Sequence, residues 1–287
     1  MSRIAIAGIQ MRIADDQDNI AAMRGRLKSL KQRFPWVSMA VFSELAAFGA
    51  AMSRAQPVPG PAEQAFRDMA AAHGMWLIPG SIYERAADGQ IFNTAMAIDP
   101  QGEVVARYRK LFPFRPYEAG IAAGAEFCVF DVPDVGRFGL SICYDSWFPE
   151  VARTLTAMGA EVLLQPVLTD TIDRDLELCI ARATAAQFQA HVVNINGVGD
   201  GGLGRSCVVD CAGTVLHLAG SDEELIPLEL NLAQVRHQRE TGIRGLGQVL
   251  KSFRDRAVDF RVYEHDSSLA AGLRQLGPLT LPGRSER

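Results

Sequence analysis

The stretch that decides how this chain folds is residues 139–150, which read GLSICYDSWFPE. It begins apolar, passes through a polar turn and reaches a proline. Proline suits the first turn of a helix, because its missing N–H would be unpaired there anyway. We therefore predict a buried strand over residues 137–142 and a helix over residues 148–158. Cys143 lies where the strand has ended and the helix is about to begin.

This position favours an activated thiol at Cys143. Free backbone N–H groups and the positive end of the helix dipole attract anions at a helix start. We expect the setting to lower the pKa of the Cys143 thiol and make it nucleophilic. The backbone N–H of Tyr144 could then donate to an oxyanion, and Asp145 could orient the loop through backbone hydrogen bonds. The alternative is a structural thiol, because a single cysteine in an apolar strand usually packs as a small hydrophobic residue.

Two other charged residues follow apolar segments. Glu44 lies in residues 41–49, VFSELAAFG, and Lys110 lies in residues 108–114, YRKLFPF. Taken singly, each has an ordinary interpretation as a solvated charge at a strand end. Taken together with Cys143, they resemble in order and setting the Glu-Lys-Cys triad of the nitrilase superfamily, the carbon–nitrogen hydrolases. The resemblance extends over residues 3–244.

The resemblance implies a role for each of these side chains. Cys143 would attack a carbonyl carbon and form a thioester, while Glu44 would transfer protons. Lys110 and the Tyr144 N–H would hold the oxyanion. Glu118 resembles the second glutamate of the family, which positions the substrate and the lysine. A carboxylate works as a base near neutral pH only if its pKa is raised, and burial at the end of an apolar strand would raise it.

The substrate pocket is weakly encoded in the sequence. Five residues fall where its walls are expected: Phe48, Tyr117, Trp147, Gln165 and Thr169. Arg174 begins a predicted long helix and could pair with a substrate carboxylate, although we favour a surface position for it.

The predicted reaction is hydrolysis of a non-peptide C–N bond in a small amide or carbamoyl compound, with release of ammonia or an amine. Tyr144 and Asp145 resemble the amidase and carbamoylase branches, because true nitrilases typically have Cys-Trp-Glu at this point. Nitrile hydrolysis is the alternative within the class. A non-catalytic binding or scaffold protein on the same fold, and acyl transfer to an amine, are the alternatives from other classes.

Strands and helices alternate in the first half of the chain and again in the second, which predicts an α/β fold with two halves. The resemblance implies a four-layer αββα sandwich of two mixed sheets with outer helices and pseudo-two-fold halves. We assign residues 1–262 to the hydrolase domain and residues 263–287 to a C-terminal extension that packs in a dimer or is irregular. The family also implies a homodimer, or a higher even oligomer, through the helix after Cys143 and this extension.

The composition gives no reason to expect a nucleic acid or a membrane as a partner, so we expect only a small-molecule substrate. The net charge of −4 gives no electrostatic reason to expect a nucleic acid or an anionic membrane. No apolar run reaches the about 18 residues of a membrane span, and five irregularly spaced cysteines are typical of reduced cytoplasmic thiols.

The five histidines are dispersed, so we expect no metal. Residues 197–202, GVGDGG, match a dinucleotide-binding pattern, but a strand is predicted after them instead of a helix, so we expect no cofactor.

Overall fold

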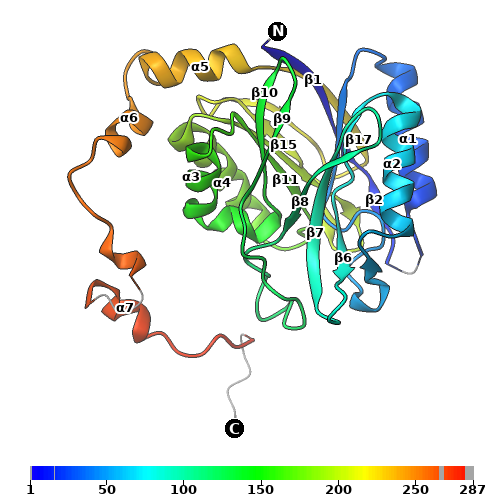
Figure 1. The fold of residues 1–287 in the computed structure, drawn as a ribbon, viewed down its shortest axis with the longest axis horizontal. Helices are drawn as coiled ribbons and strands as arrows, with labels where there is room; N and C mark the ends of the chain where they lie inside the picture. Colours follow the sequence, from blue (N-terminus) through cyan, green and yellow to red (C-terminus); the bar gives the residue numbers. More distant parts are fainter. Residues whose placement is uncertain (1, 16, 265–267, 282–287) are drawn as a thin grey trace.

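Two β-sheets pack face to face, and helices cover the outer face of each (Figure 1). The structure is a computed structural model that describes residues 2–15, 17–264 and 268–281. Helices α1 (Ile20–Arg33) and α2 (Pro61–His73) cover the first sheet, and α3 (Pro149–Ala157) and α4 (Asp173–Phe188) cover the second. The layers therefore follow the predicted αββα order.

The first sheet is mixed and contains strands from both ends of the domain. Its order is β17 (Glu224–Asn231), β1 (Arg3–Gln10), β3 (Met39–Phe42), β5 (Trp76–Ile78), β7 (Ile91–Ile98), β6 (Ser81–Arg85) and β4 (Gln56–Pro57), with β8 (Val104–Arg109) also paired to β7. Strands β1, β3 and β5 are parallel to one another. Strand β17 runs antiparallel to β1 over the full length of both, so the end of the domain closes onto its beginning.

The second sheet is also mixed. Its order is β16 (Val215–Leu218), β15 (Cys207–Val209), β12 (His191–Asn196), β11 (Val162–Val167), β10 (Gly136–Leu140) and β9 (Cys128–Val132). The unit β10-α3-β11-α4-β12 repeats the parallel arrangement of β1-α1-β3-α2-β5, which gives the predicted pair of similar halves. The repetition follows because parallel strands that are buried on both faces need helices to cover their outer face.

A small third sheet joins β2 (Arg12–Ile13), β13 (Val198–Gly199) and β14 (Gly202–Leu203). Strands β13 and β14 pair antiparallel through Gly199 and Gly202. The glycine-rich residues 197–202 therefore form a hairpin and do not open a helix, as predicted.

The segment around Cys143 differs from the prediction in one respect. A 3₁₀ helix, η2 (Cys143–Trp147), follows β10, and α3 begins only at Pro149. The α-helix therefore starts six residues after the cysteine, as the position of the proline in the sequence dictates.

The chain continues past the sandwich as a series of short helices (Figure 1). These are α5 (Leu232–Thr241), α6 (Val249–Arg254), η3 (Arg261–Tyr263), η4 (Ser268–Ala270) and α7 (Ala271–Arg274). Another short 3₁₀ helix, η1 (Met52–Arg54), lies in the first half of the described chain. Residues 265–267 and 282–287 of the predicted extension lie outside the described residues.

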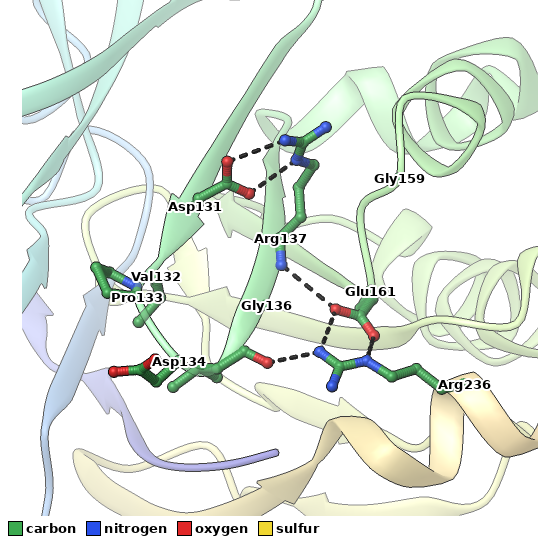
Figure 2. A pocket seen from close by; sticks show the side chains of 10 residues that line it. Asp131, Val132, Pro133, Asp134, Gly136, Arg137, Gly159, Glu161 and Arg236 are labelled. Carbon is green, nitrogen blue, oxygen red and sulfur yellow. Dashed lines mark hydrogen bonds and ion pairs between the residues drawn. The ribbon is translucent and has the colours of Figure 1, made fainter. Parts of the chain in front are cut away.

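Helix α5 is fixed to the second sheet by the charged hollow drawn in Figure 2. Arg236 Nε lies 2.6 Å from Glu161 Oε1, and Arg236 Nη2 donates to the carbonyl oxygen of Val135. Arg137 pairs with Asp131 across the neighbouring strands at 2.8 Å. Because these charges neutralise one another, we interpret the hollow as an anchor for α5.

The core between the sheets contains a stack of three aromatic rings. Phe130 lies between Trp76 and Phe138, with ring centroids 5.8 and 5.6 Å away. The rings come from β5, β9 and β10, so the stack joins the two sheets, and Phe138 is fully buried. Face-to-face sheets depend on interdigitating side chains of this kind.

We predict that Phe138→Ala lowers the free energy of unfolding by about 3–5 kcal/mol, because a large buried ring is lost and the cavity collapses only in part. Urea denaturation of the wild type and the variant measures this difference. Ile172→Ala, which removes an apolar side chain with 91% of its surface exposed, is the control and should change stability by less than about 0.5 kcal/mol. Similar losses in the two variants would contradict a core built on this stack.

Candidate active site

Three of the predicted residues follow strands that end on the same side of the sandwich. Glu44 follows β3, Lys110 follows β8 and Cys143 follows β10. The backbone N–H of Glu44 donates to the carbonyl oxygen of Val167 at the end of β11, which links the two sheets. All three side chains are buried. The stacking of the sheets therefore gathers residues that lie far apart in the sequence.

The Lys110 ammonium bridges two carboxylates. Its Nζ lies 2.9 Å from Glu44 Oε1 and 2.9 Å from Glu118 Oε2. Glu118 also accepts the backbone N–H of Phe114, which fixes it beside the segment that carries Lys110. Charge-assisted hydrogen bonds such as these hold a buried ammonium in one place.

Two neutral side chains that sequence reasoning missed complete this cluster. Asn93 Nδ2 donates to Glu44 Oε1 at 2.8 Å and lies 3.4 Å from Glu118 Oε1. The Tyr83 hydroxyl donates to Glu118 Oε1 at 3.2 Å. Asn93 interrupts the apolar strand β7, and an amide inside such a strand is a signal that could have identified it.

The two carboxylates differ in proton affinity. Burial raises the pKa of Glu44. The Lys110 charge offsets only part of this rise, and the Glu118 charge raises the pKa further. Burial also acts on Glu118, but Lys110 and several hydrogen bonds outweigh it and lower the pKa of Glu118. Burial acts to lower the pKa of Lys110, yet the surrounding acids raise it well above its usual value. The raised pKa of Glu44 agrees with the effect expected of burial at a strand end, while Lys110 stays charged.

The expectation that Cys143 has a lowered pKa is wrong. Burial raises the pKa of this thiol well above its usual value, the Glu44 charge adds to the rise, and Lys110 opposes it. The positive end of an α-helix is not available, because η2 separates Cys143 from the start of α3. The two glutamates also outnumber the one ammonium, so a third anion beside them is disfavoured. The thiol is therefore neutral at rest.

Asp145 joins the segment of Lys110 to the segment of Cys143. It accepts the backbone N–H of Phe112 at 2.9 Å, the N–H of Ile142 at 2.8 Å and the hydroxyl of Tyr108 at 2.6 Å. Burial raises the pKa of Asp145 to about 6. These contacts confirm that Asp145 orients the loop through backbone hydrogen bonds. Cys143 itself takes a left-handed conformation, with φ of 45°.

On its other side, the Cys143 thiol faces the loop after β11. Thr169 Oγ1 lies 3.8 Å from Cys143 Sγ. The Thr169 hydroxyl lies 2.9 Å from Glu177 Oε1, which sequence reasoning missed. The preference for a surface position at Arg174 is wrong, because its guanidinium is buried and pairs with Glu177 at 2.9 Å.

The remaining predicted pocket residues lie in two different environments. Tyr117 stacks on Phe114, and Tyr144 contacts both Phe114 and Trp147, so these aromatic rings form one group close to Glu118 and Cys143 in the chain.

Two predicted wall residues instead face outward from the sheets. Phe48 packs against the cluster beneath α1 and α2, whereas Cys143 belongs to the cluster between the sheets. Gln165 alternates along β11 with the inward-facing Leu164 and accepts a hydrogen bond from Asn194 at 3.2 Å. Gln165 therefore lies on the face of β11 opposite Leu164, and Phe48 packs in the outer layer beneath α1 and α2, so the structure places neither of them beside Cys143.

Within the described ranges, no group of three or more His, Cys, Asp or Glu side chains is arranged to hold a metal ion. The helices of those ranges include none with the length and apolarity needed to cross a membrane.

We predict that a disulfide reagent without an amide group, such as 4,4′-dithiodipyridine, modifies the exposed Cys179 well before Cys143 at neutral pH. The thiolate is the reacting form, and burial keeps Cys143 protonated and shielded. Peptide mass spectrometry over time measures both rates, and the unfolded chain, in which both thiols should react alike, is the control. Faster modification of Cys143 would contradict a neutral resting thiol.

Comparisons with known proteins agree with this architecture. The carbon-nitrogen hydrolase family model matches residues 3–240. A formamidase from Bacillus thuringiensis (strain Al Hakam) is 31% identical over 214 residues, which cover 71% of this chain but only 64% of the formamidase. A nitrilase-superfamily member of branch 10 from Saccharomyces cerevisiae has a similar fold, with a TM-score of 0.77 at 24% identity over 83% of this chain and 94% of that one. A carbon-nitrogen hydrolase from Helicobacter pylori G27 gives a TM-score of 0.76 at 23% identity, over 90% and 96% of the two chains. Because the family model spans most of its length, the chain belongs to the carbon–nitrogen hydrolase family.

Proposed function

We propose that this protein hydrolyses the C–N bond of a small amide through a thioester on Cys143 and releases ammonia. The observation that carries the proposal is the buried cluster in which Lys110 bridges Glu44 and Glu118, while the charges of Glu44 and Lys110 both act on the buried Cys143 thiol. The side chains that would serve as nucleophile, proton carrier and fixed positive charge thus lie in one buried cluster, which is what acyl transfer needs. The similarity to a formamidase supports a small amide as the substrate.

The raised pKa of Glu44 determines the order of events. Glu44 takes the proton from the neutral Cys143 thiol as the sulfur attacks the carbonyl carbon. The carbonyl oxygen becomes an oxyanion, which the Lys110 ammonium and the Tyr144 N–H stabilise. Glu44 then gives its proton to the leaving nitrogen, and the C–N bond breaks to leave the thioester. Finally, Glu44 removes a proton from the water that attacks the thioester, the C–S bond breaks to release the carboxylic acid, and Glu44 returns the proton to the Cys143 sulfur.

Glu118 serves to hold Lys110 in this arrangement. Its lowered pKa keeps it ionised, so it balances the ammonium without competing for the substrate proton. The aromatic group of Tyr117, Tyr144 and Trp147 provides an apolar wall for the substrate. Carbamoyl compounds and nitriles are the alternative substrates, and an ammonia-release assay tests them together with amides.

We also propose that the protein assembles as a homodimer in the cytoplasm, with residues 263–287 as an extension of the hydrolase domain. Large apolar side chains of the C-terminal segment are exposed, including Val258, Leu269, Leu273 and Leu276, and a second copy of the chain would cover them. All five cysteines are free thiols, which is consistent with a reducing compartment.

We predict that the purified protein releases ammonia from at least one small amide in a screen of amides, carbamoyl compounds and nitriles. Cys143→Ala should lower kcat by about 10⁴-fold or more, because no other group can form the thioester. Circular dichroism checks that the variant keeps its fold, and Cys179→Ala, which removes an exposed thiol, is the matched control. Full activity of Cys143→Ala would disprove the mechanism.

We predict that the acid limb of kcat/KM lies above the ordinary range of a glutamate and that Glu118→Gln moves it to lower pH by about one unit. Glu44 is active only when ionised, and its raised pKa shifts that ionisation upward. Removing the Glu118 charge takes away a repulsion and frees Lys110 to attract Glu44, so both effects lower the pKa of Glu44. Profiles of kcat/KM against pH for the two proteins measure the shift.

The matched control for this profile is Glu126→Gln, which removes an exposed carboxylate. Its acid limb should coincide with that of the wild type. An upward shift in Glu118→Gln, or an equal shift in Glu126→Gln, would contradict the assignment of Glu44 as the base.

A further inference from the structure

Thr169 is held rigidly beside the Cys143 sulfur. Its backbone N–H donates to Asn196 Oδ1 at 3.0 Å. Its carbonyl oxygen accepts from Asn196 Nδ2 at 3.0 Å and from the Leu203 N–H at 2.9 Å. Every backbone polar group of Thr169 is therefore satisfied, and only its side chain remains to interact with a ligand.

The hydroxyl proton of Thr169 is already used in a hydrogen bond within the protein. The hydroxyl donates to Glu177 Oε1 at 2.9 Å, and Glu177 in turn pairs through Oε2 with Arg174 Nη1 at 2.9 Å. A carboxylate paired with a guanidinium only accepts hydrogen bonds. The second amino group of Arg174 donates to the carbonyl oxygen of Arg205, so the guanidinium is anchored as well. This buried chain fixes the direction of the Thr169 O–H bond away from Cys143.

The pocket consequently has two sides of opposite character. Near Glu44, the Lys110 ammonium offers only donors. Beside the sulfur, Thr169 Oγ1 offers only lone pairs, 3.8 Å from Cys143 Sγ. An amide has the same division, because its carbonyl oxygen accepts hydrogen bonds and its nitrogen donates them.

We propose that Thr169 is a specificity-determining residue that accepts a hydrogen bond from the N–H of the scissile amide. This inference rests on the proposed function and adds to it the reason for choosing amides. Esters and nitriles have no N–H to offer, so they leave the Thr169 lone pairs unmatched. A site built to bond a substrate N–H discriminates strongly against analogues that lack it.

The same contact helps the C–N bond to break. In the tetrahedral intermediate, the nitrogen carries its hydrogens and one lone pair. An N–H that points to Thr169 turns the lone pair toward Glu44. The proton of Glu44 then passes to that lone pair, the electrons of the C–N bond move to the nitrogen, and the oxyanion electrons restore the carbonyl as ammonia leaves. Glu177 and Arg174 act through Thr169 and are positioning residues.

The test compares Thr169→Val, which keeps the shape but removes the acceptor, with Thr169→Ser, which keeps the hydroxyl. The substrates are a primary amide that the wild type hydrolyses and its methyl ester. We expect Thr169→Val to lower kcat/KM for the amide by about 10- to 100-fold while the ester changes by less than about threefold, because one hydrogen bond is lost for the amide alone. Thr169→Ser should retain activity on the amide within about fivefold of the wild type. Thermal melting checks that both variants fold.

A binding measurement covers the case in which the ester is a poor substrate. In the Cys143→Ala background, adding Thr169→Val should raise the Kd of the amide by about tenfold and leave the Kd of the matching nitrile unchanged. Equal losses for amide and ester, or equal changes in the two Kd values, would show that Thr169 only supports the structure and would overturn the inference. Failure of the proposed function gives a different result, which is no ammonia from the wild type or a fully active Cys143→Ala.

Discussion

The structure depends on one buried ammonium held between two carboxylates. Lys110 is almost completely inaccessible to water, and a charge in that position is tolerated only when it is paired and hydrogen-bonded. Glu44 and Glu118 each lie 2.9 Å from its Nζ, and Asn93 donates to Glu44. Removing either carboxylate would leave the lysine with too few partners. The positions of β3, β7 and β8 are therefore coupled through this single nitrogen.

Burial, followed by the excess of negative charge in this cluster, explains why the Cys143 thiol is neutral at rest. A thiolate would add a further anion to a buried site that already holds two carboxylates and one cation. In the proposed mechanism, the proton acceptor, Glu44, and the nucleophile, Cys143, are different residues, so the thiol does not have to be ionised before it reacts. In that mechanism, Glu44, whose pKa is raised, takes the proton only as Cys143 attacks, so the burial that keeps the thiol neutral also prepares the base.

The sandwich gives the pocket its two-sided polarity. The first sheet supplies Glu44 and Lys110, while the second supplies Cys143 from the end of β10 and Thr169 from the loop after β11. Asp145 holds the two sheets in register at this edge, because it accepts hydrogen bonds from Phe112 and Ile142 on opposite sides. The groups that would surround a substrate in the proposed mechanism thus come from both layers, and neither layer alone forms a site.

The sequence by itself determined the order of strands and helices, and it identified Glu44, Lys110 and Cys143 through their resemblance to a known triad. Hydrophobic periodicity and the proline at position 149 were sufficient to predict the order of the strands and helices, because both act on neighbouring residues. Only the tertiary structure decided the state of the thiol and the direction of the side chains. Phe48 and Gln165 face away from the pocket, and the buried pair of Arg174 with Glu177 fixes Thr169. Burial and through-space charge depend on which faces of the two sheets meet, and no local pattern in the chain records that.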